Sequence, residues 1–324
     1  MPHEGFGTVL GVMGSRQALP QTGGRTCITD GGMETVLLFR RGIDLPCFAA
    51  FPLVETDAGR DELRMYFEPY AVLAQERGIG LVLDTPTWRA SADWGEQLGY
   101  DPGRLAEVNR KAVGLIEQVR ADHSQTPVVV CGTVGPRDDA YRPRALMTAD
   151  EAERYHSTQV QTLADAGADM ISGLTLTYPD EAIGIARAAR RTGIPVAVSF
   201  TVETDGRLPG GTALGEAIRR VDAETNGAPA YFMINCAHPT HFTGVLEQGG
   251  DWIERIGGVR ANASRMSHAE LDEAEELDEG DPAELAEQYR VLHSLLPAAT
   301  VVGGCCGTDH RHVGAVVDAW LEAA

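Results

Sequence analysis

Short apolar runs alternate with longer segments of helical character along nearly the whole chain. The apolar runs show no strict alternation of apolar and polar residues, which is typical of parallel strands covered on both faces. They lie at 26–30, 80–85, 127–133, 168–173, 196–200, 231–236, 253–259 and 298–302. Helices are expected at 33–41, 61–77, 102–121, 148–166, 180–192, 212–222, 239–248, 282–296 and 312–322. The chain therefore reads as eight strand–helix units.

This alternation predicts an α/β fold built on a parallel sheet. Eight such units in ~300 residues favour one closed (β/α)8 TIM barrel, here residues 25–324. The alternative is an open, doubly wound sheet, which should carry a Gly-x-Gly-x-x-Gly turn after an early strand, and the chain has no such turn. Residues 1–24 are expected to form a loose N-terminal extension.

Cysteines mark the ends of two predicted strands on one rim of this barrel. Cys236 ends the sixth strand, and Cys305 and Cys306 end the eighth within Gly303-Gly304-Cys305-Cys306-Gly307-Thr308. Adjacent cysteines form a disulfide only with strain, whereas three converging thiolates can hold one Zn²⁺ ion and leave its fourth position open. Four nearby histidines are weaker candidate ligands: His238, His241, His310 and His312. Cys27, Cys47 and Cys131 are expected to be small buried apolar residues.

Other candidate residues follow the first and second strands. Asp30, in Asp30-Gly31-Gly32-Met33-Glu34, lies where a strand turns into a helix, so it either caps that helix or contacts substrate. Trp88, in the loop after the second strand, either faces a cationic ligand or packs under its loop. Arg89 follows it directly.

Composition narrows the classes of partner. The net charge of −20 argues against nucleic acid, and no stretch reaches the ~20 apolar residues of a membrane span. Six cysteines are too sparse for a disulfide scaffold, which favours a reducing cytoplasm. Lys111, the only lysine, lies in a predicted helix, which disfavours a Schiff-base lyase. The acidic segment 270–281 is expected to be a solvated loop or helix.

Four motifs together resemble the homocysteine S-methyltransferase family. They are Asp30-Gly31-Gly32-Met33-Glu34-Thr35, Ser199-Phe200-Thr201, Asn235-Cys236 and the terminal block around Cys305-Cys306. The resemblance implies a zinc ion held by Cys236, Cys305 and Cys306, with the homocysteine thiol as fourth ligand. It also implies that the turn from Asp30 to Glu34 holds the amino-acid end of the substrate, and that Thr201 and Asn235 line the same mouth.

The function implied is methyl transfer from a small methylsulfonium or methylammonium donor to a thiol, with homocysteine as the expected acceptor. The chain departs from the family pattern at Leu174, where many members carry a glutamate expected to contact the substrate ammonium. Another thiol acceptor therefore stays open, as does a non-catalytic zinc or dithiol sensor. A homo-oligomer is compatible with the sequence, which does not define the oligomeric state.

Overall fold

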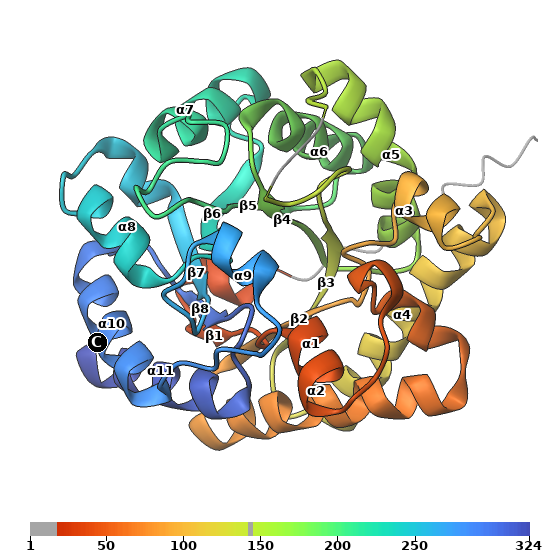
Figure 1. The fold of residues 1–324 in the computed structure, drawn as a ribbon, viewed down its shortest axis with the longest axis horizontal. Coiled ribbons are helices and arrows are strands. Elements are labelled where there is room, and N and C mark those ends of the chain that lie inside the picture. Colours follow the sequence, from red (N-terminus) through yellow and green to blue (C-terminus); the bar gives the residue numbers. More distant parts are fainter. Residues whose placement is uncertain (1–17, 142–144) are drawn as a thin grey trace, which may run out of the picture.

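The computed structural model describes residues 18–141 and 145–324, in which eight parallel strands close into a barrel (Figure 1). The strands pair in sequence order, and β1 pairs with both β2 and β8, so the sheet has no edge. They are β1 Cys27–Ile28, β2 Gly80–Asp84, β3 Val128–Val134, β4 Met170–Leu176, β5 Val196–Phe200, β6 Pro229–Asn235, β7 Ile256–Ala261 and β8 Val301–Gly304. The predicted single barrel is confirmed, and the open sheet is wrong.

Helices surround the barrel on its outside (Figure 1). The α-helices are α1 Met33–Thr35, α2 Asp57–Arg77, α3 Ala92–Gln97, α4 Pro102–Asp122, α5 Ala149–Asp165, α6 Pro179–Thr192, α7 Leu214–Thr225, α8 Pro239–Leu246, α9 His268–Glu273, α10 Pro282–Leu295 and α11 His310–Ala323. Shorter elements are η1 Pro20–Gly23, η2 Val36–Arg40 (a π-helix), η3 Pro46–Phe48, η4 Phe51–Glu55 and η5 Asp251–Arg255.

Local sequence explains where the longer helices begin. Four of them start with proline at their first position, where the missing N–H has no helical partner to lose: α4, α6, α8 and α10. Thr148 caps α5 in the predicted capping box with Glu151. The short α3 and α9 were not predicted, because each lies inside a strand-to-helix loop.

The interior of the sheet is a packed core. Every residue of the eight strands is buried except Ala230 in β6. This double-sided burial accounts for the continuous apolar runs in the sequence, since helices cover one face and the barrel interior covers the other.

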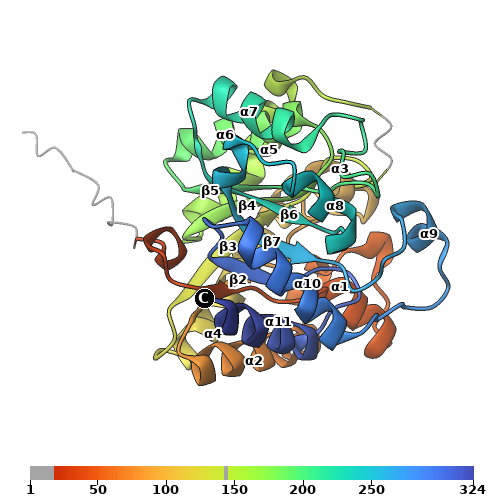
Figure 2. The same cartoon turned by 90° about the vertical axis from the view of Figure 1, so that its left-hand side faces the viewer.

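Part of the predicted N-terminal extension packs against the barrel. The structure describes residues 18–24 of it, and Leu19 and Gln21 are buried there. Gln21 accepts a hydrogen bond from the Thr300 hydroxyl through its backbone carbonyl, 3.0 Å away. Figure 2 shows this segment in dark red at the end of the barrel opposite α9. Among the described residues, no helix is long and apolar enough to cross a membrane.

Candidate metal centre

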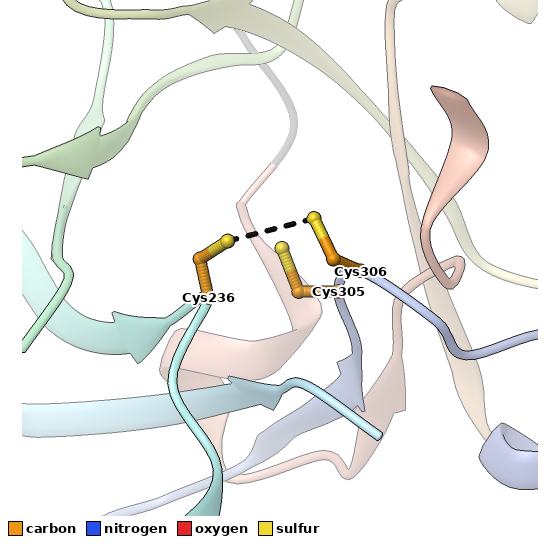
Figure 3. Close-up of side chains that lie close together, drawn as sticks. All are labelled: Cys236, Cys305 and Cys306. Carbon is orange, nitrogen blue, oxygen red and sulfur yellow. Dashed lines mark hydrogen bonds between the residues drawn. The ribbon is translucent and has the colours of Figure 1, made fainter. Parts of the chain in front are cut away.

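The three predicted cysteines meet at the rim formed by the carboxyl ends of the strands. Cys236 follows β6, Cys305 and Cys306 follow β8, and their sulfurs all lie within 4.8 Å of one another (Figure 3). Cys236 Sγ and Cys306 Sγ are 3.6 Å apart, too far for a disulfide of ~2.05 Å. Tetrahedral zinc with Zn–S bonds of ~2.3 Å separates its sulfurs by about 3.8 Å. The donor set therefore fits one soft metal ion.

Glycines let the turn that carries Cys305 and Cys306 dock against the turn after β1. Gly304 N–H donates to Asp30 O at 3.1 Å, and Gly32 N–H donates to Thr308 O at 3.0 Å. A Cβ on Gly303 would collide with the Thr29 hydroxyl, so a side chain has no room where the two segments touch. The two glycine motifs of the sequence thus form one structural unit.

Cys236 is held in an uncommon backbone conformation. Its φ is 56°, in the left-handed region that non-glycine residues rarely adopt. Its N–H donates to Arg260 O at 3.1 Å, and its carbonyl accepts from His268 Nε2 at 2.8 Å and from Thr201 Oγ1 at 3.2 Å. These bonds compensate the conformational cost and aim the Cys236 sulfur at the other two.

Polar side chains also contact the sulfurs. Tyr141 Oη lies 2.9 Å from Cys236 Sγ, and its ring stacks on His268 with centroids 4.1 Å apart. Burial, followed by charge on Cys236, raises the pKa of Tyr141, so its hydroxyl stays protonated and can donate to Cys236 when that sulfur is a metal-bound thiolate. Asn235 Nδ2 donates to Cys305 Sγ at 3.8 Å.

The three thiols titrate together. Hydrogen bonding from Cys236, then from Cys306, lowers the pKa of Cys305 well below its usual value, and the Arg260 guanidinium lowers it further. Hydrogen bonding from Cys236, then from Cys305, raises the pKa of Cys306, and the contact with Cys305 raises the pKa of Cys236. Cys305 is therefore the first of the three to become the thiolate that a metal ion binds.

The cysteines open into a cavity of about 530 Å³. Its walls include most of the residues predicted for the substrate site: Asp30, Gly31, Gly32, Met33, Glu34, Trp88 and Asn235. Thr201 was also expected there, but it is fully buried behind the wall, where its hydroxyl holds the Cys236 carbonyl. Its side chain points at the backbone because β5 delivers it beneath the cysteine turn.

Asp30 belongs to a buried charge network across the barrel. Arg260 Nη2 donates to Asp30 Oδ1 at 2.6 Å, and Arg260 Nη1 pairs with Asp84. Tyr66 donates to the other Asp30 oxygen at 3.1 Å. Burial raises the pKa of Asp30 to about 8, although Arg260 opposes this rise. Asp30 does not cap α1, whose first turn has no side-chain cap.

Glu34 and Arg89 are the other ionisable pair at the cavity wall near the cysteines. Burial raises the pKa of Glu34 to about 7, and the Cys305 charge adds to this while Arg89 and Arg260 oppose it. Burial lowers the pKa of Arg89 to about 10. The Arg89 guanidinium lies 4.4 Å from the Trp88 ring centroid, and Trp88 donates to Leu174 O at 3.3 Å. Trp88 therefore lines the cavity and also packs against Arg89 and Leu174.

Leu174 lies near the end of β4 as predicted and lines the cavity with its apolar side chain. The next residue, Thr175, has a φ of 61°, and its N–H donates to Asn235 Oδ1 at 3.0 Å. Among the described residues, β4 therefore contributes no carboxylate to the wall.

Histidines do not join the cysteine cluster in the part of the chain that the structure describes. His238 bonds Thr240, His241 bonds Arg265 O at 3.0 Å, and His312 bonds Asp309. His310 is exposed at the start of α11.

Two expectations about other residues need correction. Cys27 and Cys131 are buried as expected, but Cys47 is exposed at the cavity mouth, because it lies in a tight turn with a φ of 57°. The acidic segment is more than a solvated loop. Several of its residues form cavity wall: Leu271, Asp272, Ala274, Glu276, Leu277 and Asp278.

Sequence reasoning missed Arg260, Tyr141 and His268. Arg260 could have been noticed as a charged residue that directly follows an apolar strand. Tyr141 lies in an irregular loop and His268 begins the short α9, and no local pattern distinguishes either from a surface residue.

Comparison with known proteins agrees with this geometry. The family model for homocysteine S-methyltransferase matches residues 27–320. Homocysteine S-methyltransferase 4 of Zea mays is 23% identical over 347 residues, covering 98% of this chain and 96% of its own. The oxidised form of the homocysteine methyltransferase MmuM from Escherichia coli superposes with a TM-score of 0.71 at 22% identity, covering 90% of this chain and 95% of that chain. Its metallated form has a TM-score of 0.69 at 20% identity, with the same coverage.

These likenesses to MmuM concern the fold. The family match is more specific, because it extends from β1 to α11 and includes all three clustered cysteines. The chain therefore belongs to the homocysteine S-methyltransferase family, a family of thiol S-methyltransferases.

Proposed function

We propose that the protein uses a zinc ion, held by Cys236, Cys305 and Cys306, to methylate homocysteine from a small methylsulfonium or methylammonium donor. The observation that carries the proposal is the convergence of the three sulfurs, within 4.8 Å of one another, at the floor of a cavity of about 530 Å³. Three sulfur ligands leave one tetrahedral position for the acceptor. The solved metallated form of MmuM supports metal binding on this fold.

A free thiol has a pKa of ~8.5, so little of it is the reactive thiolate at neutral pH. A bound zinc ion would lower the pKa of the thiol, so that the thiol loses its proton on coordination. The chain's own residues hold the geometry: Asn235 donates to Cys305, Tyr141 donates to Cys236, and Arg260 fixes Gly304 O at 3.2 Å. Alignment of acceptor and donor is then the main remaining contribution of the enzyme.

The cavity wall favours a cationic donor. Carboxylates of Glu34, Asp139, Asp272, Glu276 and Asp278 line it, against Arg89 and the already paired Arg260. A sulfonium or quaternary ammonium centre is attracted by this excess of negative charge among the described wall residues. Loss of the methyl group converts a sulfonium donor into a neutral thioether, so the attraction of a sulfonium to the wall is lost after reaction. Trp88 adds an aromatic face to the same wall.

The glycine turn supports the amino-acid end of the acceptor. The segment Asp30, Gly31, Gly32 and Met33 presents backbone at the cavity wall beside Cys305 and Cys306. Asn235 and Thr201 contribute indirectly, by holding the cysteines in place. Asn235 donates a hydrogen bond to Cys305 Sγ, and Thr201 donates one to the Cys236 carbonyl.

Metal analysis of a Cys236→Ala variant tests the assignment. We expect it to lose zinc and methyl transfer together, because two sulfurs do not replace a three-sulfur site. Cys27→Ala is the control, since Cys27 is buried outside the cluster. Stoichiometric zinc in the Cys236 variant would contradict the proposal and favour the alternative of a dithiol sensor that uses Cys305 and Cys306.

A donor panel with homocysteine, read by mass spectrometry, then identifies the donor class. S-Methylmethionine, S-adenosylmethionine, betaine and dimethylsulfoniopropionate each carry a cationic methyl centre. Methyltetrahydrofolate provides the contrast. Methionine formation from the folate alone would refute the donor class proposed.

A further inference from the structure

Arg89 is a buried cation at the cavity wall with an incomplete set of partners. It is 8% exposed, and its Nε has no hydrogen-bond partner among the described residues. Its Nη1 donates to Asp138 O at 3.3 Å. The guanidinium lies 3.7 Å from the Trp94 ring centroid and 4.4 Å from that of Trp88. Two aromatic rings thus fix a guanidinium at the cavity wall, where it suits a planar carboxylate.

Glu34 lines the same cavity as this guanidinium and the cysteines. The charges of Cys305, Arg89 and Arg260 all act on its carboxylate. In the described part of the chain, no salt bridge or side-chain hydrogen bond to another residue occupies it. A carboxylate in this position can receive a cationic group of a ligand.

Neighbouring polar groups are already engaged. Asp30 pairs with Arg260 and Tyr66, and the Asn235 amide is bonded to Thr175 through both its oxygen and its nitrogen. Leu174 offers only an apolar side chain. Of the charged groups that reach the cavity from the turns after β1 and β2, Glu34 and Arg89 therefore remain to recognise a zwitterion.

We propose that Glu34 binds the ammonium and Arg89 binds the carboxylate of an α-amino-acid thiol whose sulfur lies at the three cysteines. This inference rests on the proposed function and specifies its acceptor. Three points of attachment select a thiol that carries both charged groups and reject simple alkyl thiols. Glu34 takes the place of the missing carboxylate at Leu174, from a different strand-to-helix turn.

Calorimetric titration of the zinc-loaded protein without donor tests the assignment independently of catalysis. The ligands are L-homocysteine, 3-amino-1-propanethiol, which lacks the carboxylate, and 4-mercaptobutyrate, which lacks the ammonium. We expect Arg89→Gln to weaken the binding of homocysteine by roughly 10- to 100-fold and to leave the affinity for 3-amino-1-propanethiol unchanged. Glu34→Gln should weaken homocysteine binding by a similar factor and leave the affinity for 4-mercaptobutyrate unchanged.

Matched variants control for folding. Arg104→Gln removes a guanidinium that also stacks on an aromatic ring, Tyr100 at 4.1 Å, but lies outside the cavity, so it should bind all three ligands as wild type does. Arg89→Lys keeps the charge without the two-pronged geometry and should restore part of the homocysteine affinity.

Equal weakening of all three ligands by Arg89→Gln would show a merely structural role and overturn the assignment. Unchanged homocysteine binding in the Arg89→Gln variant would also overturn it. The same holds if Arg89→Gln changes only the KM of a donor that carries a carboxylate, such as betaine. If the wild-type protein binds zinc but no homocysteine, the proposed acceptor itself fails. If the wild-type protein binds homocysteine and the variants bind it equally well, only the roles of Glu34 and Arg89 are refuted.

Discussion

Replacement of Arg260 by methionine should destabilise the barrel in a pH-dependent way. Arg260 is 5% exposed and binds Asp30, Asp84 and the carbonyl of Gly304. Methionine keeps the length of the side chain but removes its charge. Two buried carboxyl groups, 1% and 4% exposed, then lack a counter-charge.

The size of the effect follows from this burial. Removal of one partner from a buried ion pair costs about 3–5 kcal/mol of unfolding free energy. Burial already raises the pKa of Asp30 to about 8 in the wild type, where one guanidinium serves two carboxyl groups. Without Arg260, the folded variant must hold one more proton than the wild type, whereas an unfolded aspartate releases it near pH ~3.9.

The sign of the pH dependence is set by proton uptake. A carboxyl group whose pKa is raised on folding is destabilising above its unfolded pKa, and the loss grows as pH rises towards its folded pKa. The difference between wild type and Arg260→Met should therefore widen by up to about 1.4 kcal/mol for each pH unit in that interval.

Urea unfolding at pH 6 and pH 8, followed by circular dichroism, measures both quantities. Arg255→Met is the matched control, because Arg255 binds Asp222 at 2.7 and 2.9 Å and Pro229 O at 2.7 Å, yet is 33% exposed. It should cost about 1 kcal/mol or less at either pH. Equal losses for the two variants, or a pH-independent loss for Arg260→Met, would refute the reasoning.

Two further changes test the cysteine site. Tyr141→Phe removes the hydroxyl 2.9 Å from Cys236 Sγ but keeps the ring stacked on His268, so zinc affinity should fall roughly 10-fold in a chelator competition. An unchanged affinity would show that the hydroxyl does not support the site. Gly303→Ala places a Cβ against the Thr29 hydroxyl and should lower both Tm and zinc content. Adding Thr29→Ala should restore part of both, and failure of this rescue would argue against a steric cause.

The barrel and the cysteine cluster could be predicted from the sequence for one reason. Apolar runs identify core strands, and parallel strands bring their carboxyl ends to one rim. Cys236 and Cys305 lie 69 residues apart in the chain, yet their separation is fixed by the barrel alone. No side-chain packing had to be known for this step.

Strand ends were harder to predict, and one error had a functional consequence. The seventh strand was expected at 253–259, whereas β7 runs over Ile256–Ala261 and includes Arg260. Local pattern assigns a charged residue to a loop, because an isolated buried charge is costly. The partners that make its burial tolerable are Asp30, in the turn after β1, and Asp84, at the end of β2, and they cannot be paired with it from the sequence alone.

Loop residues were unpredictable for a different physical reason. The contact of Tyr141 with Cys236 depends on the left-handed backbone at Cys236 and on the ring of His268 beneath it. None of these features leaves a periodic signal, since each depends on two loops that meet only in the folded chain.

If the donor is cationic, as proposed, the arrangement of charge in the cavity places its selection in the loop after β7 rather than at the barrel floor. At the floor, Arg260 lies next to the cysteine turn and is satisfied by two aspartates, so it adds little net charge. At the mouth, Asp272, Glu276 and Asp278 face the cavity. A small sulfonium is attracted on entering and loses that attraction once its methyl group has left, whereas a polyanionic donor is repelled throughout. Under the proposed function, the acidic segment that resembles solvated surface in the sequence would therefore separate donors by charge.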